Sequence, residues 1–202
     1  MIELIKRGPD GIDGIVSLYA IPEEWAQDDE VFKSWWEPKT ELGSDGLYHI
    51  VEPARISDEA KAQRLLMEPV HNLIMNAGIT RYLNNNAATA QSGMQPICQI
   101  LSVGNTNSGS PITRADTAVS GDGFGTNARR APNSNSVVGF QVTITTNYLS
   151  GDAQGTWTNI GWYGGGSATT TTGTGTLYTH ANFPYPKGAS AVAVNYVFLM
   201  GN

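Results

Sequence analysis

The side chains that most often carry chemistry in proteins are few and scattered in this 202-residue sequence. Its three histidines, His49, His71 and His180, lie far apart, and none has a cysteine or a second histidine at the spacing of a zinc site. The single cysteine, Cys98, falls within an apolar run, which indicates a small core side chain rather than a reactive thiol. We therefore expect structural or surface roles for the histidines, no metal centre and no cofactor.

Catalytic carboxylates are equally hard to find. Beyond residue 71 the acidic residues are only Asp116, Asp122 and Asp152, each in a Gly- or Ser-rich stretch where aspartate serves turn geometry. The sequence GDGFG at 121–125 lacks both the acidic spacing of an EF-hand and the lysine of a P-loop. No GxSxG motif is present, and no Ser/His/Asp set stands out by spacing. These observations predict a protein that is not an enzyme.

Charge is concentrated at the N-terminal end of the chain. Residues 1–70 carry 15 acidic and 7 basic residues, whereas residues 71–202 carry 3 acidic and 5 basic ones. A nucleic-acid binder needs a basic face, so we expect no such partner, and we expect the Arg129–Arg130 pair in a solvated loop. The N-terminus lacks a signal pattern and no apolar run approaches the roughly 18 residues of a membrane helix, which predicts cytoplasmic synthesis without membrane insertion.

Residues 1–56 read as an acidic, aromatic-rich arm. Apolar residues between positions 12 and 19 predict one strand, in a run broken by glycines. A short helix is expected over 22–36, because Pro22 suits a first helical turn and acidic residues follow it. Large aromatic side chains crowd a segment too short and too charged to build its own core, and they must be buried somewhere. They either fold back on the rest of the chain or anchor in a neighbouring chain, and we prefer the second interpretation. The candidate assembly contacts are Trp25, Phe32, Trp35 and Trp36.

Residues 57–86 form a predicted helical segment. Ser57 has the properties of an N-cap, with acidic residues in the following turn, and the first helix should run to Pro69. Apolar residues at helical spacing predict a second helix over about 70–83.

Residues 87–202 have the pattern of an antiparallel β domain. Polar stretches at 105–136 and 164–176 separate apolar or alternating runs, and prolines 184 and 186 should end a strand. We expect loops over 105–136 with one short strand, and a flexible, unpacked hairpin loop over 164–176. The fold class is mainly β: an antiparallel sandwich or jelly-roll-like domain with an extended N-terminal arm and one or two short helices. The predicted strands are 97–103, 137–149, 156–163, 177–183 and 189–200.

Two aromatic residues beside the 164–176 loop suggest a binding surface. If Trp162 and Tyr163 are exposed, they could stack on sugar rings of a host-surface glycan. The other interpretation places these aromatics in the core.

Five short stretches share a pattern with a known family. They are Asn72–Gly78, Ser102–Gly104, Thr113–Val119, Asn159–Tyr163 and Ala181–Phe183. In the pattern a segment like NLI-NAG precedes a strand ending in VG, and a turn with N-I-G-W follows later. These stretches resemble virion structural proteins of tailed bacteriophages, of the head-decoration, collar or tail-attachment β-domain type. The resemblance spans roughly residues 70–202, and Asn105 stands where a second glycine is expected.

The resemblance implies a function in assembly rather than catalysis. It predicts a protein of the virion, made in the host cytoplasm, whose partners are other copies of itself, in a predicted trimer, and other virion proteins. The N-terminal arm would dock on a neighbouring subunit. The alternative is a receptor- or glycan-binding module of a virion appendage, and a hydrolase acting on surface polymers ranks far behind.

Overall fold

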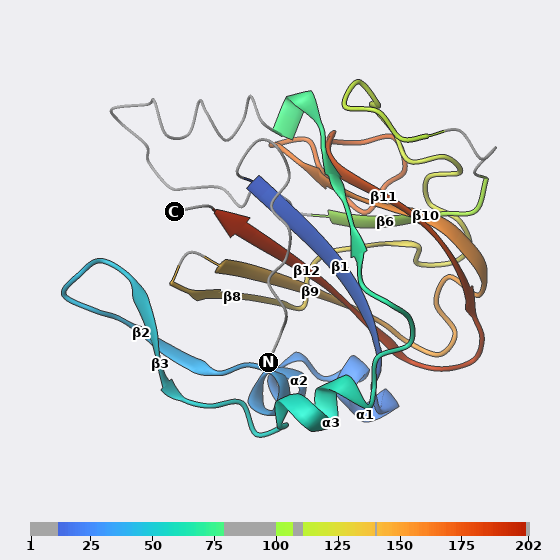
Figure 1. Cartoon of the computed structure of the whole chain (residues 1–202). Coiled ribbons are helices and arrows are strands. Elements are labelled where there is room, and N and C mark those ends of the chain that lie inside the picture. The colour runs from blue at the N-terminus through green and yellow to red at the C-terminus, as the bar shows by residue number, and fades with distance from the viewer. Residues whose placement is uncertain (1–11, 79–99, 107–110, 140, 201–202) are drawn as a thin grey trace. The chain divides into compact units, whose positions relative to one another are not determined.

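The computed structural model describes residues 12–78, 100–106, 111–139 and 141–200 (Figure 1). The chain is mainly β, and all of its paired strands are antiparallel. Two five-stranded sheets, one two-stranded sheet and a few short helices make up the described elements, which is consistent with a sandwich. The predicted fold class is confirmed.

The chain folds as two compact units, and each unit combines stretches that are far apart in the sequence. Unit 1 comprises Met1–His71, Asn133–Ser150 and Ser190–Asn202, and unit 2 comprises Asn72–Pro132 and Gly151–Ala189. Neither unit coincides with the predicted segments 1–56, 57–86 and 87–202, because strands close in space are distant along the chain.

Unit 1 is built on a sheet with the strand order β4-β1-β12-β9-β8. Its longest pairing joins β1 to β12, with Ile12 opposite Met200 and Ala20 opposite Val192. Side chains from alternate positions, such as Leu18, Val194 and Tyr196, are almost fully buried, as period-two alternation in these strands dictates. The strands are β1 (Ile12–Ala20), β4 (Val70–His71), β8 (Ser134–Val138), β9 (Gln141–Tyr148) and β12 (Val192–Met200).

Three short helices and a hairpin complete unit 1. The single predicted helix over 22–36 is divided in two, since Asp28 is extended and its carboxylate caps the second helix by accepting from the backbone N–H groups of Glu30 and Val31. Ser57 caps the third helix as predicted, accepting from the N–H of Ala60. The elements are α1 (Glu23–Gln27), α2 (Asp29–Trp36), β2 (Lys39–Leu42), β3 (Tyr48–Glu52) and α3 (Asp58–Ala62).

Unit 2 is built on a sheet with the strand order β5-β11-β10-β6-β7. All five residues of β6 are buried, and β10 pairs with β6 on one side and β11 on the other. The predicted short strand within 105–136 is present as β7. The strands are β5 (Leu73–Ile74), β6 (Ile100–Gly104), β7 (Arg129–Arg130), β10 (Gly155–Gly164) and β11 (Thr176–Lys187).

The strand expected near residues 12–19 is present as β1, but it lies between β4 and β12 within a sheet rather than in a separate arm. The second helix expected for the N-terminal half is wrong over most of its described part. Residues 70–74, expected to be helical, form β4 and β5 instead, because each pairs with a strand of a different sheet. Helical backbone appears only at 76–78, and the rest of that predicted helix lies outside the described residues, as does Cys98.

Two strand boundaries also differ from prediction. The supposed strand 137–149 is a hairpin, β8 and β9, that turns at Gly139 with a positive φ of 53°. β11 continues through Pro184 and Pro186, since beyond residue 180 it pairs with β10 on one side only and the ladder tolerates two missing N–H donors.

Candidate functional site

The aromatic side chains predicted as assembly contacts mostly face their own unit. Trp25, Phe32 and Trp36 are 8%, 0% and 3% exposed, in a cluster of unit 1 with residues from the start of β12. Trp36 packs edge-on against Tyr19 of β1, with ring centroids 5.1 Å apart. The prediction that these three side chains anchor in a neighbouring chain is therefore wrong. The alternative interpretation, in which they fold back on the rest of their own chain, is correct.

Trp35 differs from the other three. It is 40% exposed and stacks on Trp25, with centroids 5.4 Å apart and an interplanar angle of 17°. The Arg55 guanidinium lies 6.0 Å from its ring centroid. Trp35 is the only one of the four predicted contacts whose ring is available to a partner, and its role in assembly stays a prediction.

The two predicted loop aromatics, Trp162 and Tyr163, are buried, so their predicted exposure is wrong. They are 1% and 2% exposed, since both belong to β10 at the middle of the unit 2 sheet. Burial raises the pKa of Tyr163 to about 12, and its hydroxyl accepts a 2.8 Å hydrogen bond from the N–H of Val119. Neither ring is placed to stack on a sugar.

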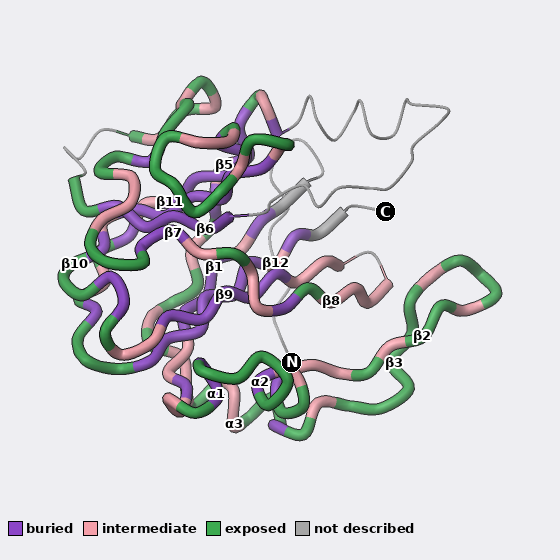
Figure 2. The backbone as a smooth tube through the Cα atoms, turned by 180° about the vertical axis from the view of Figure 1, so that it is seen from behind, coloured by how far each residue is buried: buried purple, intermediate pink, exposed green. Residues whose placement is uncertain are grey.

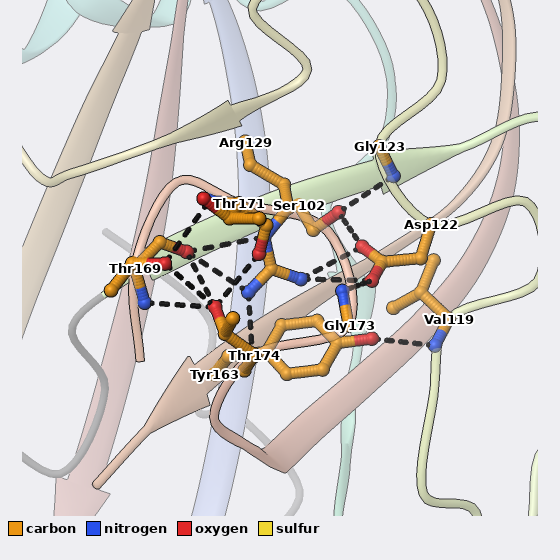
Figure 3. Close-up of polar contacts among 10 residues, drawn as sticks. All are labelled: Ser102, Val119, Asp122, Gly123, Arg129, Tyr163, Thr169, Thr171, Gly173 and Thr174. Atoms are coloured by element: carbon orange, nitrogen blue, oxygen red, sulfur yellow. Dashed lines mark hydrogen bonds and ion pairs between the residues drawn. The ribbon is translucent and has the colours of Figure 1, made fainter. Parts of the chain in front are cut away.

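Tyr163 belongs to a buried polar cluster around Arg129 (Figure 3). The guanidinium lies 4.2 Å from the Tyr163 ring centroid and donates twice to the Asp122 carboxylate, at 2.9 Å to each oxygen. It also donates to the backbone carbonyls of Thr169 and Thr174. The expectation of a solvated loop is thus wrong for Arg129, whose side chain is 2% exposed.

The Arg129 cluster also corrects the description of residues 164–176. This stretch is the predicted hairpin loop between β10 and β11, but it is not unpacked: two of its carbonyls bind the guanidinium, and the N–H of Gly173 donates to Asp122. Ser102 donates its hydroxyl proton to the same carboxylate. The donors of Arg129 are engaged within the protein, so we assign the cluster to loop anchoring rather than to anion binding.

The exposed part of unit 1 that most resembles an interaction surface is the β2–β3 hairpin (Figure 2). All five residues of β3 are exposed, and so are three of the four in β2. Among the described residues, seven large apolar side chains are exposed, and four belong to this hairpin. These four are Leu42 (61%), Tyr48 (42%), Ile50 (51%) and Val51 (47%).

The hairpin has two chemically different faces. Directly opposed residues share a face, so the pairs Leu42–Tyr48 and Thr40–Ile50 form what we call the apolar face. The pair Glu41–His49 points the other way. There the Asp45 carboxylate and His49 Nε2 form a 2.9 Å hydrogen bond, which lowers the pKa of Asp45.

Local sequence explains why this segment forms a hairpin. Gly43 and Gly46 frame the turn, with a φ of +78° at Gly46, and Gly43 donates to the Leu47 carbonyl at 2.8 Å. The Gly139 N–H donates to the Tyr48 carbonyl at 2.9 Å and so ties the hairpin to the β8–β9 turn. A two-stranded hairpin solvated on both faces is marginally stable, and an apolar face with no cover in its own unit is typical of a docking element.

The stretches that carry the family resemblance meet within unit 2. Asn159 of β10 pairs with Gly104 of β6, and its side-chain amide donates to the Ser120 carbonyl at 3.0 Å. A Cβ on Gly104 would overlap that same carbonyl oxygen. The N–H of Met75 donates to the Tyr178 carbonyl at 2.8 Å. These residues serve close packing between strands.

Within the described ranges, no group of three or more His, Cys, Asp or Glu side chains is placed to hold a metal ion. None of the helices described has the length and apolar character that crossing a bilayer requires. Comparisons with protein-family models, curated proteins and solved structures give no match to this chain.

Proposed function

We propose that this chain is a non-enzymatic structural protein of a tailed-phage virion, which works by multimeric assembly through the β2–β3 hairpin. The observation that carries the assembly function is the exposed apolar face of the hairpin, formed by Leu42, Tyr48 and Ile50 with Thr40. The virion assignment rests on the resemblance of residues 70–202. The partner is a second copy of the chain, and a trimer is the predicted oligomer.

The hairpin takes over the function predicted for the whole N-terminal arm. Burying an apolar side chain that is half exposed contributes about 1 kcal/mol, so the apolar face supplies part of the free energy of docking, and further contacts on the neighbour must supply the rest. Trp35 is the one aromatic side chain from the predicted set that could extend this contact.

Adjacent residues on opposite faces give a matched test of assembly. Ile50→Lys places a charge on the apolar face, whereas His49→Lys places the same side chain on the polar face, beside Asp45. We expect Ile50→Lys to weaken self-association at least tenfold and His49→Lys to leave it unchanged, measured by light scattering over a dilution series. Equal masses for both variants and the wild type would contradict a docking function for this face.

The virion assignment has its own test. The chain should co-purify with intact particles of the phage that encodes it, and the Ile50→Lys variant should be lost from them while the His49→Lys variant is retained. Deletion of residues 1–56 is unsuitable because it removes β1 from the sheet. Absence of the wild-type chain from purified particles would refute a structural role in the virion, whatever its oligomeric state.

The alternative, a receptor- or glycan-binding module, stays a prediction without the contacts first expected for it. Trp162 and Tyr163 are both buried in unit 2, so they are removed from that hypothesis.

A further inference from the structure

A cavity of about 410 Å³ lies in unit 2 between the loop 111–120 and strand β11. This volume falls within the range of small-molecule sites in proteins. Its apolar lining residues come from the loop and include Pro111, Ile112 and Ala115. Its polar lining residues are Asp116, Thr117, Ser120, His180 and Asn182.

The walls of the cavity are held by hydrogen bonds on both sides of the loop. The N–H of Asn76 donates to the Arg114 carbonyl at 3.0 Å, and the side chain of Asn159 donates to the Ser120 carbonyl at 3.0 Å. The loop is therefore anchored to other segments of unit 2 at two points, Arg114 and Ser120, on either side of Asp116. Fixing the loop beside Asp116 in this way lowers the cost of ordering it when a ligand binds.

A buried histidine, His180, is part of the lining. Its side chain is 5% exposed, and its Nδ1 and Nε2 atoms lie 3.3 Å from side-chain oxygens of Asp116 and Asn159 respectively. The amide nitrogen of Asn159 donates to Ser120 and Thr158, which fixes its oxygen toward the imidazole. With protein atoms at both ring nitrogens, His180 is not placed to activate a nucleophile.

Asp116 presents the acceptor that a ligand can use. Its carboxylate accepts from the Thr113 hydroxyl at 2.7 Å, the Thr113 N–H at 3.1 Å and His180 at 3.3 Å. A carboxylate offers about four lone-pair positions, so one position is left beyond these three contacts. The Asp116 side chain is 28% exposed, so that position can be reached from the cavity.

The chemistry of the lining selects the ligand class. Lysine and arginine are absent from the lining, and the negative carboxylate disfavours phosphates and other anions. Hydroxyl and amide groups supply both donors and acceptors, and the lining also contains apolar residues. A neutral sugar has matching features, since its hydroxyl groups both donate and accept and its C–H face is apolar.

We propose that this cavity is a binding site for one neutral saccharide unit, with the Asp116 carboxylate accepting a hydrogen bond from a ligand hydroxyl. His180 acts as a positioning residue, because its contact with the Asp116 carboxylate fixes the orientation of that side chain. The site lies wholly in unit 2 and does not depend on the hairpin of unit 1, so its failure would leave the assembly proposal intact.

The test is titration of the full-length, ¹⁵N-labelled chain with the methyl glycosides of glucose, galactose and N-acetylglucosamine, followed by NMR. We expect saturable shifts at residues lining the cavity for at least one glycoside, with a Kd of about 1 mM, as suits one small ligand in a polar site. Ala115→Phe should fill the cavity and abolish these shifts. Asp116→Asn should weaken binding about tenfold, because a charge-assisted hydrogen bond becomes a neutral one.

Asp45→Asn, the same substitution on the exposed hairpin of unit 1, serves as the matched control and should leave the Kd unchanged. The Ala115→Phe variant leaves the Asp116 side chain unchanged. If Asp116→Asn fails to fold, loss of the glycoside-induced shifts in Ala115→Phe therefore tests the proposal. No saturable shift with any of the three glycosides would overturn the proposal. Shifts produced by methylammonium in place of the glycosides would also overturn it and assign the cavity to cations.

Discussion

The buried ion pair between Arg129 and Asp122 allows a quantitative prediction about unit 2. Their side chains are 2% and 11% exposed, and five hydrogen bonds join the guanidinium to Asp122, Thr169 and Thr174. Replacing one member of such a pair leaves an uncompensated charge out of water, which costs about 3–5 kcal/mol. We therefore expect Arg129→Met to lower the free energy of unfolding by about that amount.

A double-mutant cycle separates this pair from simple loss of packing. Asp122→Asn strands the guanidinium, and the combined Arg129→Met and Asp122→Asn variant strands neither charge. The double variant should thus cost less than the sum of the single ones by about 2 kcal/mol. Lys39→Met, which removes the exposed ion pair to Glu52, is the control and should have little effect.

Urea unfolding followed by tryptophan fluorescence gives the free energies, and hydrogen exchange gives a local readout. Because two carbonyls of the 164–176 loop bind Arg129, exchange in this loop should speed up in Arg129→Met and stay unchanged in Lys39→Met. A loss below about 1 kcal/mol, with unchanged exchange in the loop, would show that the pair does not hold the loop and would refute the assigned role.

Three further predictions concern packing and pH. Gly104→Ala should destabilise by about 1–3 kcal/mol, because a Cβ there meets a backbone carbonyl, whereas Gly151→Ala, with nothing within 4 Å, should be neutral in the same urea titration. Trp36→Ala should cost about 3–5 kcal/mol and the half-exposed Trp35→Ala about 1 kcal/mol; equal costs would contradict the cluster in unit 1. Burial lowers the pKa of His180, so the unfolded chain binds more protons in acid, and stability should fall as the pH drops below about 6.5. His180→Gln should flatten that loss, and an unchanged pH slope would contradict it.

Much of the β structure was predictable because the alternation of apolar and polar residues reports burial directly. Strands β10 and β12 appear nearly where the pattern placed them. The apolar residues at 12–19 also indicated β1, but not its place in a sheet, because its partner β12 lies near the other end of the chain. Pairing at that separation leaves no local signal.

The candidate sites were less predictable than the strands. The sequence correctly indicated that Trp25 and Trp36 must be buried. It did not indicate which residues cover them, because those residues include ones from the start of β12, far along the chain. The turn of the hairpin was predictable, because residues 37–56 carry turn-forming glycines between two prolines. Its apolar face was not predictable, because the pairing register of the two strands decides which side chains share a face. The partners of Arg129 lie up to 45 positions away, and composition alone gave no sign of them.

The central claim is self-assembly through the apolar face of the hairpin, and solution mass tests it most directly. Light scattering on the wild type, Ile50→Lys and His49→Lys should give a discrete oligomer, predicted to be a trimer, for the wild type and His49→Lys. It should give the mass of a single chain for Ile50→Lys. A wild type that remains a single chain at every concentration, or an Ile50→Lys variant that assembles as the wild type does, would contradict the account.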